Sequence, residues 1–187
     1  MRILTISEIL CLVLFMGCQE SRISQEFYQK YQNIPANEIS ARKTRLNAYL
    51  KEICTSLKTN ERIACLQSRI IIVPFKKGDL FWAKAISKTI EITTVSLIEF
   101  SDGVQKFVLA HEMGHVLLDH YKSFSSDKKE IDADAFAVKI VGPKNALNFF
   151  KEAAGIEVKS GYIQTENDLL TRNDIILRIA AINQLSR

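Results

Sequence analysis

One five-residue motif limits what this chain can fold into more than any other feature. Residues 111–115 read His-Glu-Met-Gly-His. They lie in a run, residues 104–121, that contains no proline and repeats its apolar residues at helical spacing. At about 100° per residue, His111 and His115 share one face of a helix, so both imidazoles can reach a single tetrahedral ion. The motif therefore predicts a zinc-binding helix, with chance occurrence of its three fixed letters as the alternative.

A catalytic zinc site needs a third protein ligand, and the remaining histidine of the chain is the first candidate. His120 follows His111 by nine residues, so in one continuous helix the two side chains point about 180° apart. A second known arrangement, in which a glycine breaks the helix before a third histidine, would need different residues at Leu118 and Tyr121. We therefore expect His120 to be a surface or core-edge residue and not a ligand.

The segment 128–142 offers a better third ligand. Its apolar residues predict a second amphipathic helix, opened by acidic residues that suit a helix N-terminus. Glu130 and Asp134 are four residues apart and share a face of that helix. Glu130 can therefore bind the metal while Asp134 accepts a hydrogen bond from a ligand histidine. A solvated acidic face is the alternative, and Asp132, about 200° away from Glu130, is the weaker ligand candidate.

The two segments together resemble a known enzyme family. HEMGHVLLDH (111–120) followed by EIDADAFA (130–137) is similar to the gluzincin metallopeptidases of the HtpX and BepA type, which carry HExxH and a later E-x-x-x-D. Weaker similarity extends over residues 70–182. The resemblance implies that Glu112 is the general base assisting a zinc-bound water. It also implies three ligands for one Zn²⁺ per chain: His111, His115 and Glu130.

The chain departs from this family in its C-terminal segment. The family's arginine corresponds to Arg178, and six residues earlier, where relatives carry a His-Pro pair that helps to stabilise the transition state, this chain has Arg172. Arg172 or Tyr162 is a candidate transition-state donor, because either side chain can hydrogen-bond to a developing alkoxide. The Asn-Ala pair that lines the family's substrate cleft is also absent. Substrate preference therefore cannot be transferred from the relatives.

The first 17 residues predict export. They contain one arginine and an apolar stretch too short to span a bilayer, and a cysteine follows them. The ending Leu-Phe-Met-Gly-Cys resembles a bacterial lipoprotein box, which implies cleavage before Cys18 and lipidation of its sulfur. Glu8 and Phe15 are unusual in such a leader, and an amphipathic N-terminal helix is the alternative. The predicted parts are a signal peptide (1–17), a tether (18–34) and a metallopeptidase domain (35–187).

The use of cysteine agrees with an oxidising compartment. Cys11 would leave with the leader and Cys18 would carry lipid, which leaves Cys54 and Cys65 as an even pair. We expect this pair to form a disulfide, with two reduced thiols as the alternative. The localisation implied is the bacterial cell envelope, with a lipid anchor in the outer membrane on its periplasmic side or on the outer face of the cell membrane.

The rest of the chain suits one compact α+β domain. We expect a small, mostly helical gluzincin domain with an antiparallel-rich sheet beside the motif helix. The sheet would comprise a strand at 69–75 and an antiparallel pair at 80–86 and 89–95, and helices would start at Pro35 and span 171–185. Gluzincins hold an extended substrate against an edge strand, and either member of the strand pair is a candidate.

These features predict a membrane-tethered zinc metalloendopeptidase that hydrolyses peptide bonds of exported envelope proteins, misfolded ones included. Its partners are then a protein or peptide substrate and the membrane, through the lipid anchor. The net charge of +4 is spread along the chain without a basic cluster, which argues against a nucleic-acid partner. Two alternatives stay open: a catalytically weak or inactive zinc-binding lipoprotein that acts as a peptide-binding, chaperone-like module, and a cytosolic gluzincin that cleaves a partner regulator.

Overall fold

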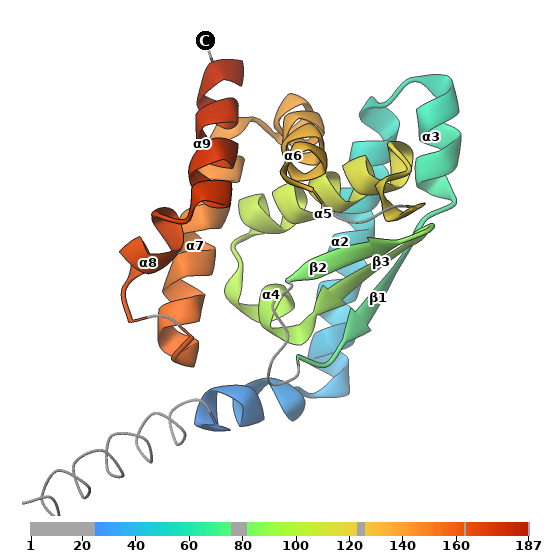
Figure 1. Cartoon of the computed structure of the whole chain (residues 1–187). Helices are drawn as coiled ribbons and strands as arrows, with labels where there is room; N and C mark the ends of the chain where they lie inside the picture. The colour runs from blue at the N-terminus through green and yellow to red at the C-terminus, as the bar shows by residue number, and fades with distance from the viewer. Residues whose placement is uncertain (1–24, 76–81, 123–125, 163, 187) are drawn as a thin grey trace, which may run out of the picture.

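The computed structural model describes residues 25–75, 82–122, 126–162 and 164–186. It has a mostly helical α+β fold with one small three-stranded sheet (Figure 1). The predicted signal peptide and the predicted lipidation site, Cys18, lie outside the described residues. Among the helices that are described, none combines the length and the apolar character needed to cross a membrane.

The sheet has the strand order β1-β3-β2, with β1 at Arg69–Val73, β2 at Ala83–Ile86 and β3 at Thr89–Thr93. β2 pairs antiparallel with β3 through a tight turn in which Ser87 has a positive φ of 54°. β1 instead runs parallel to β3. The sheet is therefore mixed and not antiparallel-rich, because the pairing of β1 depends on a long-range contact that its own pattern does not specify.

Strand β3 ends earlier than its apolar pattern predicts. The pattern extends to Val95, but the hydroxyl of Thr93 accepts a hydrogen bond from the Ser96 N–H and caps a short helix, α4 (Thr94–Glu99). Val95 is fully buried as a helical residue. A local helix cap thus overrides the β propensity of this segment.

The motif lies in α5 (Asp102–Leu117), which is buried along most of its length and lies between the sheet and α6 (Asp127–Val141) (Figure 1). Gly114 within the motif allows the two helices to approach closely. A Cβ at this position would lie 3.1 Å from the Cα of Ala133 and 3.3 Å from the Cβ of Phe136. The glycine therefore lets the start of α6 cross the histidine-bearing face of α5.

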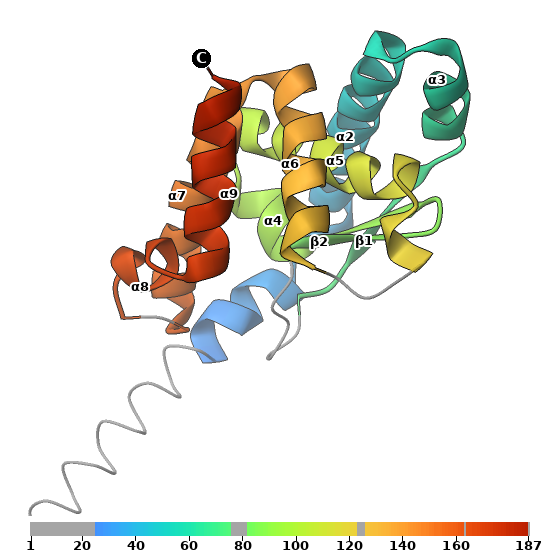
Figure 2. The same cartoon turned by 45° about the horizontal axis from the view of Figure 1, so that its top comes forward.

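Three C-terminal helices complete this side of the molecule: α7 (Pro143–Ser160), α8 (Glu166–Leu170) and α9 (Asn173–Leu185). Figure 2 shows α9 alongside α6, with α2 and α3 at the other end of the molecule. α9 buries Ile175 and Ile182, whereas Ile176 is 47% exposed. The helix predicted from residue 171 starts only after Arg172.

Residues 25–32, which fall within the tether predicted over residues 18–34, form a helix that belongs to the core. Phe27, Tyr28 and Tyr31 are all buried, and the ring of Tyr28 stacks on Phe75 with 5.2 Å between centroids. The three aromatic residues share one face of the helix, and the polar residues between them cover the other face. A mostly polar composition therefore concealed an amphipathic helix.

Helices α2 (Ala36–Ser56) and α3 (Thr59–Leu66) are joined by a disulfide at the end of the molecule opposite α9. α2 begins directly after Pro35, whose fixed φ suits a helix start. Cys54 and Cys65 are bonded to each other, and both are fully buried. Closing a loop of this size stabilises the folded chain by about 2–3 kcal/mol.

Candidate metal centre

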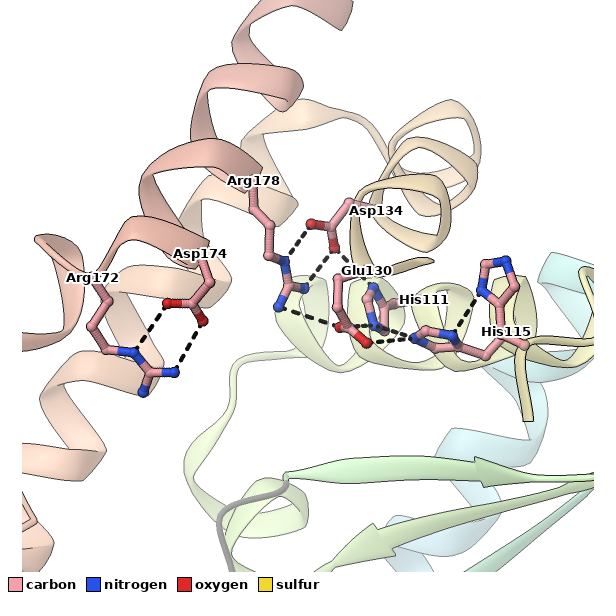
Figure 3. A network of polar contacts seen from close by, with 8 residues as sticks. His111, His115, Glu130, Asp134, Arg172, Asp174 and Arg178 are labelled. Carbon is pink, nitrogen blue, oxygen red and sulfur yellow. Dashed lines mark hydrogen bonds and ion pairs between the residues drawn. The ribbon is translucent and has the colours of Figure 1, made fainter. Parts of the chain in front are cut away.

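The two motif histidines lie one turn apart on the face of α5 that α6 covers (Figure 3). Their Nε2 atoms are 3.0 Å apart. Glu130, from the first turn of α6, places its Oε2 3.3 Å from Nε2 of His111 and its Oε1 3.4 Å from Nε2 of His115. Within the described part of the chain, these three residues form the one group of ligand-type side chains close enough to share an ion.

The spacing of the three residues fits a tetrahedral metal ion. A zinc ion with bonds of about 2.0–2.1 Å separates its ligand atoms by about 3.3 Å. The distances of 3.0, 3.3 and 3.4 Å in this cluster are close to that value. Two imidazoles and one carboxylate are also a donor set that catalytic zinc sites use, with the fourth position left for water or substrate.

Each motif histidine has a partner on its other ring nitrogen. Nδ1 of His111 lies 2.8 Å from Oδ1 of Asp134, and Nδ1 of His115 lies 3.0 Å from Nδ1 of His120. A proton on each Nδ1, donated to these acceptors, leaves both Nε2 lone pairs directed at the carboxylate of Glu130. Three acceptors then converge on one point, and a cation is the partner that satisfies all of them.

Arg178, from α9, holds the acidic side of the cluster in place. Its Nε and Nη2 donate to the two carboxylate oxygens of Asp134 at 2.7 and 2.8 Å, and its Nη1 lies 3.4 Å from Oε2 of Glu130 (Figure 3). The side chain of Asp134 is 1% exposed. In the sequence, Arg178 matches the arginine of the family's C-terminal segment. No pattern in the sequence indicates that its side chain contacts Glu130 and Asp134.

Burial and charge set the protonation of the cluster in the absence of an ion. Burial alone would lower the pKa of His111, but the carboxylates of Asp134 and Glu130 outweigh it and raise the pKa to about 9. Burial and the neighbouring His111 lower the pKa of His115 to about 4. Burial would raise the pKa of Glu130, but His111 and Arg178 bring it down to about 2. A proton on His111 therefore takes the place of a cation.

Glu112, the predicted general base, is buried beside the two histidines. Burial raises its pKa to about 7, against the opposing influence of His111 and of a hydrogen bond from the backbone of Ala85. Ala85 belongs to β2, the edge strand nearest α5. Glu112 thus lies between the ligand cluster and the β2 edge of the sheet.

His120 lies beside His115 and not on the opposite side of the helix as expected. The expectation assumed one continuous helix, but α5 ends at Leu117 and Asp119 adopts a left-handed φ of 56°. The chain then turns back into a 3-10 turn, η1 (His120–Lys122). His120 approaches His115 on Nδ1, away from the converging Nε2 atoms, so it is not placed to bind the same ion.

The two candidate transition-state donors lie apart from the ligands. The guanidinium of Arg172 pairs with Asp174 at 3.0 and 3.2 Å, and Figure 3 shows this pair to one side of the cluster. Tyr162 follows α7 and is 37% exposed, and the C-terminal end of α7 points away from α5 (Figure 1). Of the arginines considered in this segment, the structure brings Arg178 and not Arg172 to the site.

Similarity to known proteins covers this part of the chain. Residues 99–159 match the model of the Peptidase M78 family, described as the IrrE N-terminal-like domain. That segment includes α5, α6 and most of α7, with the three ligand-type residues and Glu112 inside it. Comparison with the curated proteins and with the solved structures gives no match. The chain is therefore similar to a metallopeptidase-like family over this segment, whereas a specific likeness to gluzincins of the HtpX and BepA type stays a prediction.

Proposed function

We propose that the chain is a zinc metallopeptidase in which His111, His115 and Glu130 bind the ion and Glu112 is the general base. The observation that carries this proposal is the convergence of the two Nε2 atoms, 3.0 Å apart, on the carboxylate of Glu130, whose Oε2 lies 3.3 Å from His111 and whose Oε1 lies 3.4 Å from His115. The similarity of residues 99–159 to a peptidase family supports it. Within this function, a gluzincin of the HtpX and BepA type is the specific class that the E-x-x-x-D spacing favours.

The chain's own residues supply the proton transfers of peptide hydrolysis. A zinc ion, when bound, contributes Lewis-acid chemistry by polarising a peptide carbonyl and a water. Glu112 accepts the proton of the attacking water and returns it to the leaving amine. The pKa of its buried carboxyl, raised to about 7 in the metal-free protein, shows how strongly its surroundings favour the protonated form. The backbone of Ala85 orients that carboxyl through a hydrogen bond.

We place the peptide substrate along β2. Of the two strands that the sequence left open for this role, β3 is central in the sheet, whereas β2 is at its edge. The hydrogen bond between the Ala85 backbone and Glu112 indicates that this edge faces the site. An extended peptide that pairs with β2 along this edge would bring its scissile carbonyl beside the ligands.

Cleavage of unfolded casein by the zinc-loaded protein tests this proposal. Glu112→Gln should lower the cleavage rate by about 10²–10⁴-fold while zinc still binds at one ion per chain. Glu130→Ala should lose both zinc and cleavage, which separates the ligand from the base. Equal inertness of the wild type and Glu112→Gln, with zinc bound to both, would overturn the enzymatic function.

That outcome would favour a second candidate, a catalytically weak or inactive zinc-binding protein that holds peptides in a chaperone-like way. The placement of Arg172 is the observation in its favour. This guanidinium pairs with Asp174 away from the ligands, and Arg178 directs its donors at carboxylates, so neither is aimed at a developing alkoxide. Binding of a fluorescent extended peptide without turnover would identify this function.

We also propose that the protein is exported and attached to a membrane through a lipid on Cys18. The buried disulfide between Cys54 and Cys65 supports an oxidising compartment. Cells grown with a radioactive fatty acid should label the wild-type protein but not Cys18→Ala. A wild-type protein that takes up no label would contradict the anchor and would favour the cytosolic alternative.

A further inference from the structure

The turn that follows the motif helix brings a third histidine back to the site. His115 and His120 are five residues apart, so in a continuous α-helix their side chains would point about 140° away from each other. Because the helix ends at Leu117 and Asp119 is left-handed, the two rings instead meet with 5.1 Å between centroids and 3.0 Å between the Nδ1 atoms. The contact therefore exists only because the chain leaves the helix at this point.

Ring chemistry fixes the direction of this hydrogen bond when an ion is bound. A neutral histidine that presents Nε2 to a metal must carry its proton on Nδ1. His115 therefore donates through Nδ1, and His120 accepts through Nδ1 with its own proton on Nε2. His120 therefore accepts the Nδ1 hydrogen bond of His115, as Asp134 accepts that of His111. The acceptor is an imidazole in the first case and a carboxylate in the second.

His120 is itself held from the helix that supplies the third ligand. Nζ of Lys129 donates to the backbone carbonyl of His120 at 3.0 Å, and Lys129 precedes Glu130 in α6. The histidine is half-buried, so its ring is not a freely rotating surface group. The turn η1 is thus hydrogen-bonded to the first turn of α6, which also carries the ligand-type residue Glu130.

We propose that His120 is a positioning residue for the metal ligand His115, which it keeps in the tautomer and ring orientation that direct Nε2 to the ion. This inference rests on the proposed zinc site and adds a residue to it. Partners of this kind typically change metal affinity by about 10–100-fold. A neutral acceptor strengthens its ligand less than a carboxylate does, so we expect the effect of His120 near the lower end of that range.

The test compares two replacements of similar size in the full chain. His120→Asn keeps an acceptor oxygen close to the position of Nδ1, whereas His120→Leu fills the space without an acceptor. Chelator competition should show zinc affinity weakened about tenfold in His120→Leu and about unchanged in His120→Asn. The visible absorption spectrum of the Co²⁺-loaded protein should shift in the leucine variant and not in the asparagine variant, because only the former frees the ring of His115. Lys128→Gln, at an exposed position in the first turn of α6, is the control that should match wild type in both measurements.

Three outcomes would overturn the inference. Equal zinc affinity in wild type and His120→Leu would show that the contact does not act on the ligand. Equal weakening in the leucine and asparagine variants would show that the ring matters for packing and not as an acceptor. A wild-type protein that binds no zinc would remove the proposed function itself, an outcome that is distinguishable from the first two because they require zinc binding by the wild type.

Discussion

The two motif histidines lie one turn apart on the same helix, yet the structure holds them in different ways. At the inner end of the site, His111 pairs with the buried carboxylate of Asp134, which Arg178 clamps with two hydrogen bonds. At the outer end, His115 pairs with His120, a neutral ring in an irregular turn. The pKa of His111 is raised to about 9, whereas that of His115 is lowered to about 4.

The difference shows that the two ligands of one site can depend on different parts of the fold. The inner ligand depends on packing between helices, and the outer ligand depends on a local turn. The inner end brings together α5, α6 and α9, so its charges are part of the packing between three helices. The outer end depends on a few residues that follow α5. We therefore expect changes at the inner end to affect both folding and metal binding, and changes at the outer end to affect mainly metal binding.

The largest expected effect follows from Asp134→Ala. This change leaves the largely buried Arg178 without its main partner and His111 without its acceptor. Loss of one member of a buried ion pair costs about 3–5 kcal/mol, so urea should unfold the metal-free variant at a much lower concentration. Zinc affinity should also fall by about 10–100-fold in chelator competition.

The matched control at the outer end is His120→Leu. Its metal-free form should stay within about 1 kcal/mol of wild type, as expected for a partly exposed residue with a neutral partner. If the two variants lost the same free energy of unfolding, the contrast between the inner and outer ends would be wrong.

The second prediction concerns pH. Between about pH 6.5 and pH 9, His111 at the inner end keeps a proton in the folded protein that it loses in the unfolded chain. The pKa of His111 is raised from 6.5 to about 9, so its contribution to stability is fully present below pH 6.5 and is lost as the pH rises through 9. The metal-free protein should therefore lose up to about 3 kcal/mol over this range. Melting temperatures measured in chelator between pH 6 and pH 9.5 test this.

Zinc should reverse that trend, since the ion and the proton compete for Nε2 of His111. The rise in melting temperature on adding zinc should therefore grow from pH 6.5 to pH 9. The upper part of this window lies above the pKa of Glu112, about 7, so it reports mainly on His111. A melting temperature of the metal-free protein that stayed flat above pH 7.5 would contradict the inner-end assignment.

The sequence predicts the geometry of the site wherever a single helix determines it. Spacing within α5 was enough to predict that His111 and His115 share a face, and spacing within α6 did the same for Glu130 and Asp134. These predictions need only the helical period, which the apolar pattern reveals. The helix that starts after Pro35 was predictable for the same reason, whereas α4 formed where the pattern predicted the end of a strand.

The rest depended on events that periodicity does not encode. His120 was misplaced because its position follows from the backbone angle of one residue, Asp119, at the end of a helix. Arg178 was missed as a site residue because 44 positions separate it from Asp134, and only tertiary packing joins them. The parallel pairing of β1 with β3 was missed for the same reason.

The third prediction concerns Gly114, which lies between the two motif histidines in α5 and packs against α6. Gly114→Ala would place a Cβ 3.1 Å from the Cα of Ala133, and a backbone atom cannot move aside cheaply. Overpacking of this kind costs about 1–3 kcal/mol, and it should also weaken zinc binding because α6 carries Glu130 away from α5. Urea unfolding and chelator competition measure the two effects.

Gly155→Ala is the matched control for that prediction. Gly155 also lies within a helix, α7, but a Cβ there would meet its nearest neighbour, Oε1 of Glu166, at an ordinary 3.7 Å. Alanine should therefore stabilise this helix by about 0.5–1 kcal/mol. Similar losses in both variants would show that helix spacing at Gly114 does not control the site.

The smallest expected effect comes from substitutions at Asp119, which test the backbone turn at the outer end. Asp119 has a φ of 56°, a conformation that costs a β-branched residue about 1–2 kcal/mol and glycine almost nothing. Asp119→Val and Asp119→Gly both remove the ion pair with Lys122 at 2.8 Å, so the difference between them reports on backbone conformation alone. We expect the valine variant to lose about 1 kcal/mol relative to the glycine variant and to weaken zinc binding as His120→Leu does, because the strained turn no longer returns His120 to His115. Equal zinc affinities in the two Asp119 variants would mean that the outer end holds its ligand without this turn, and the contrast with the inner end would then lie in charge alone.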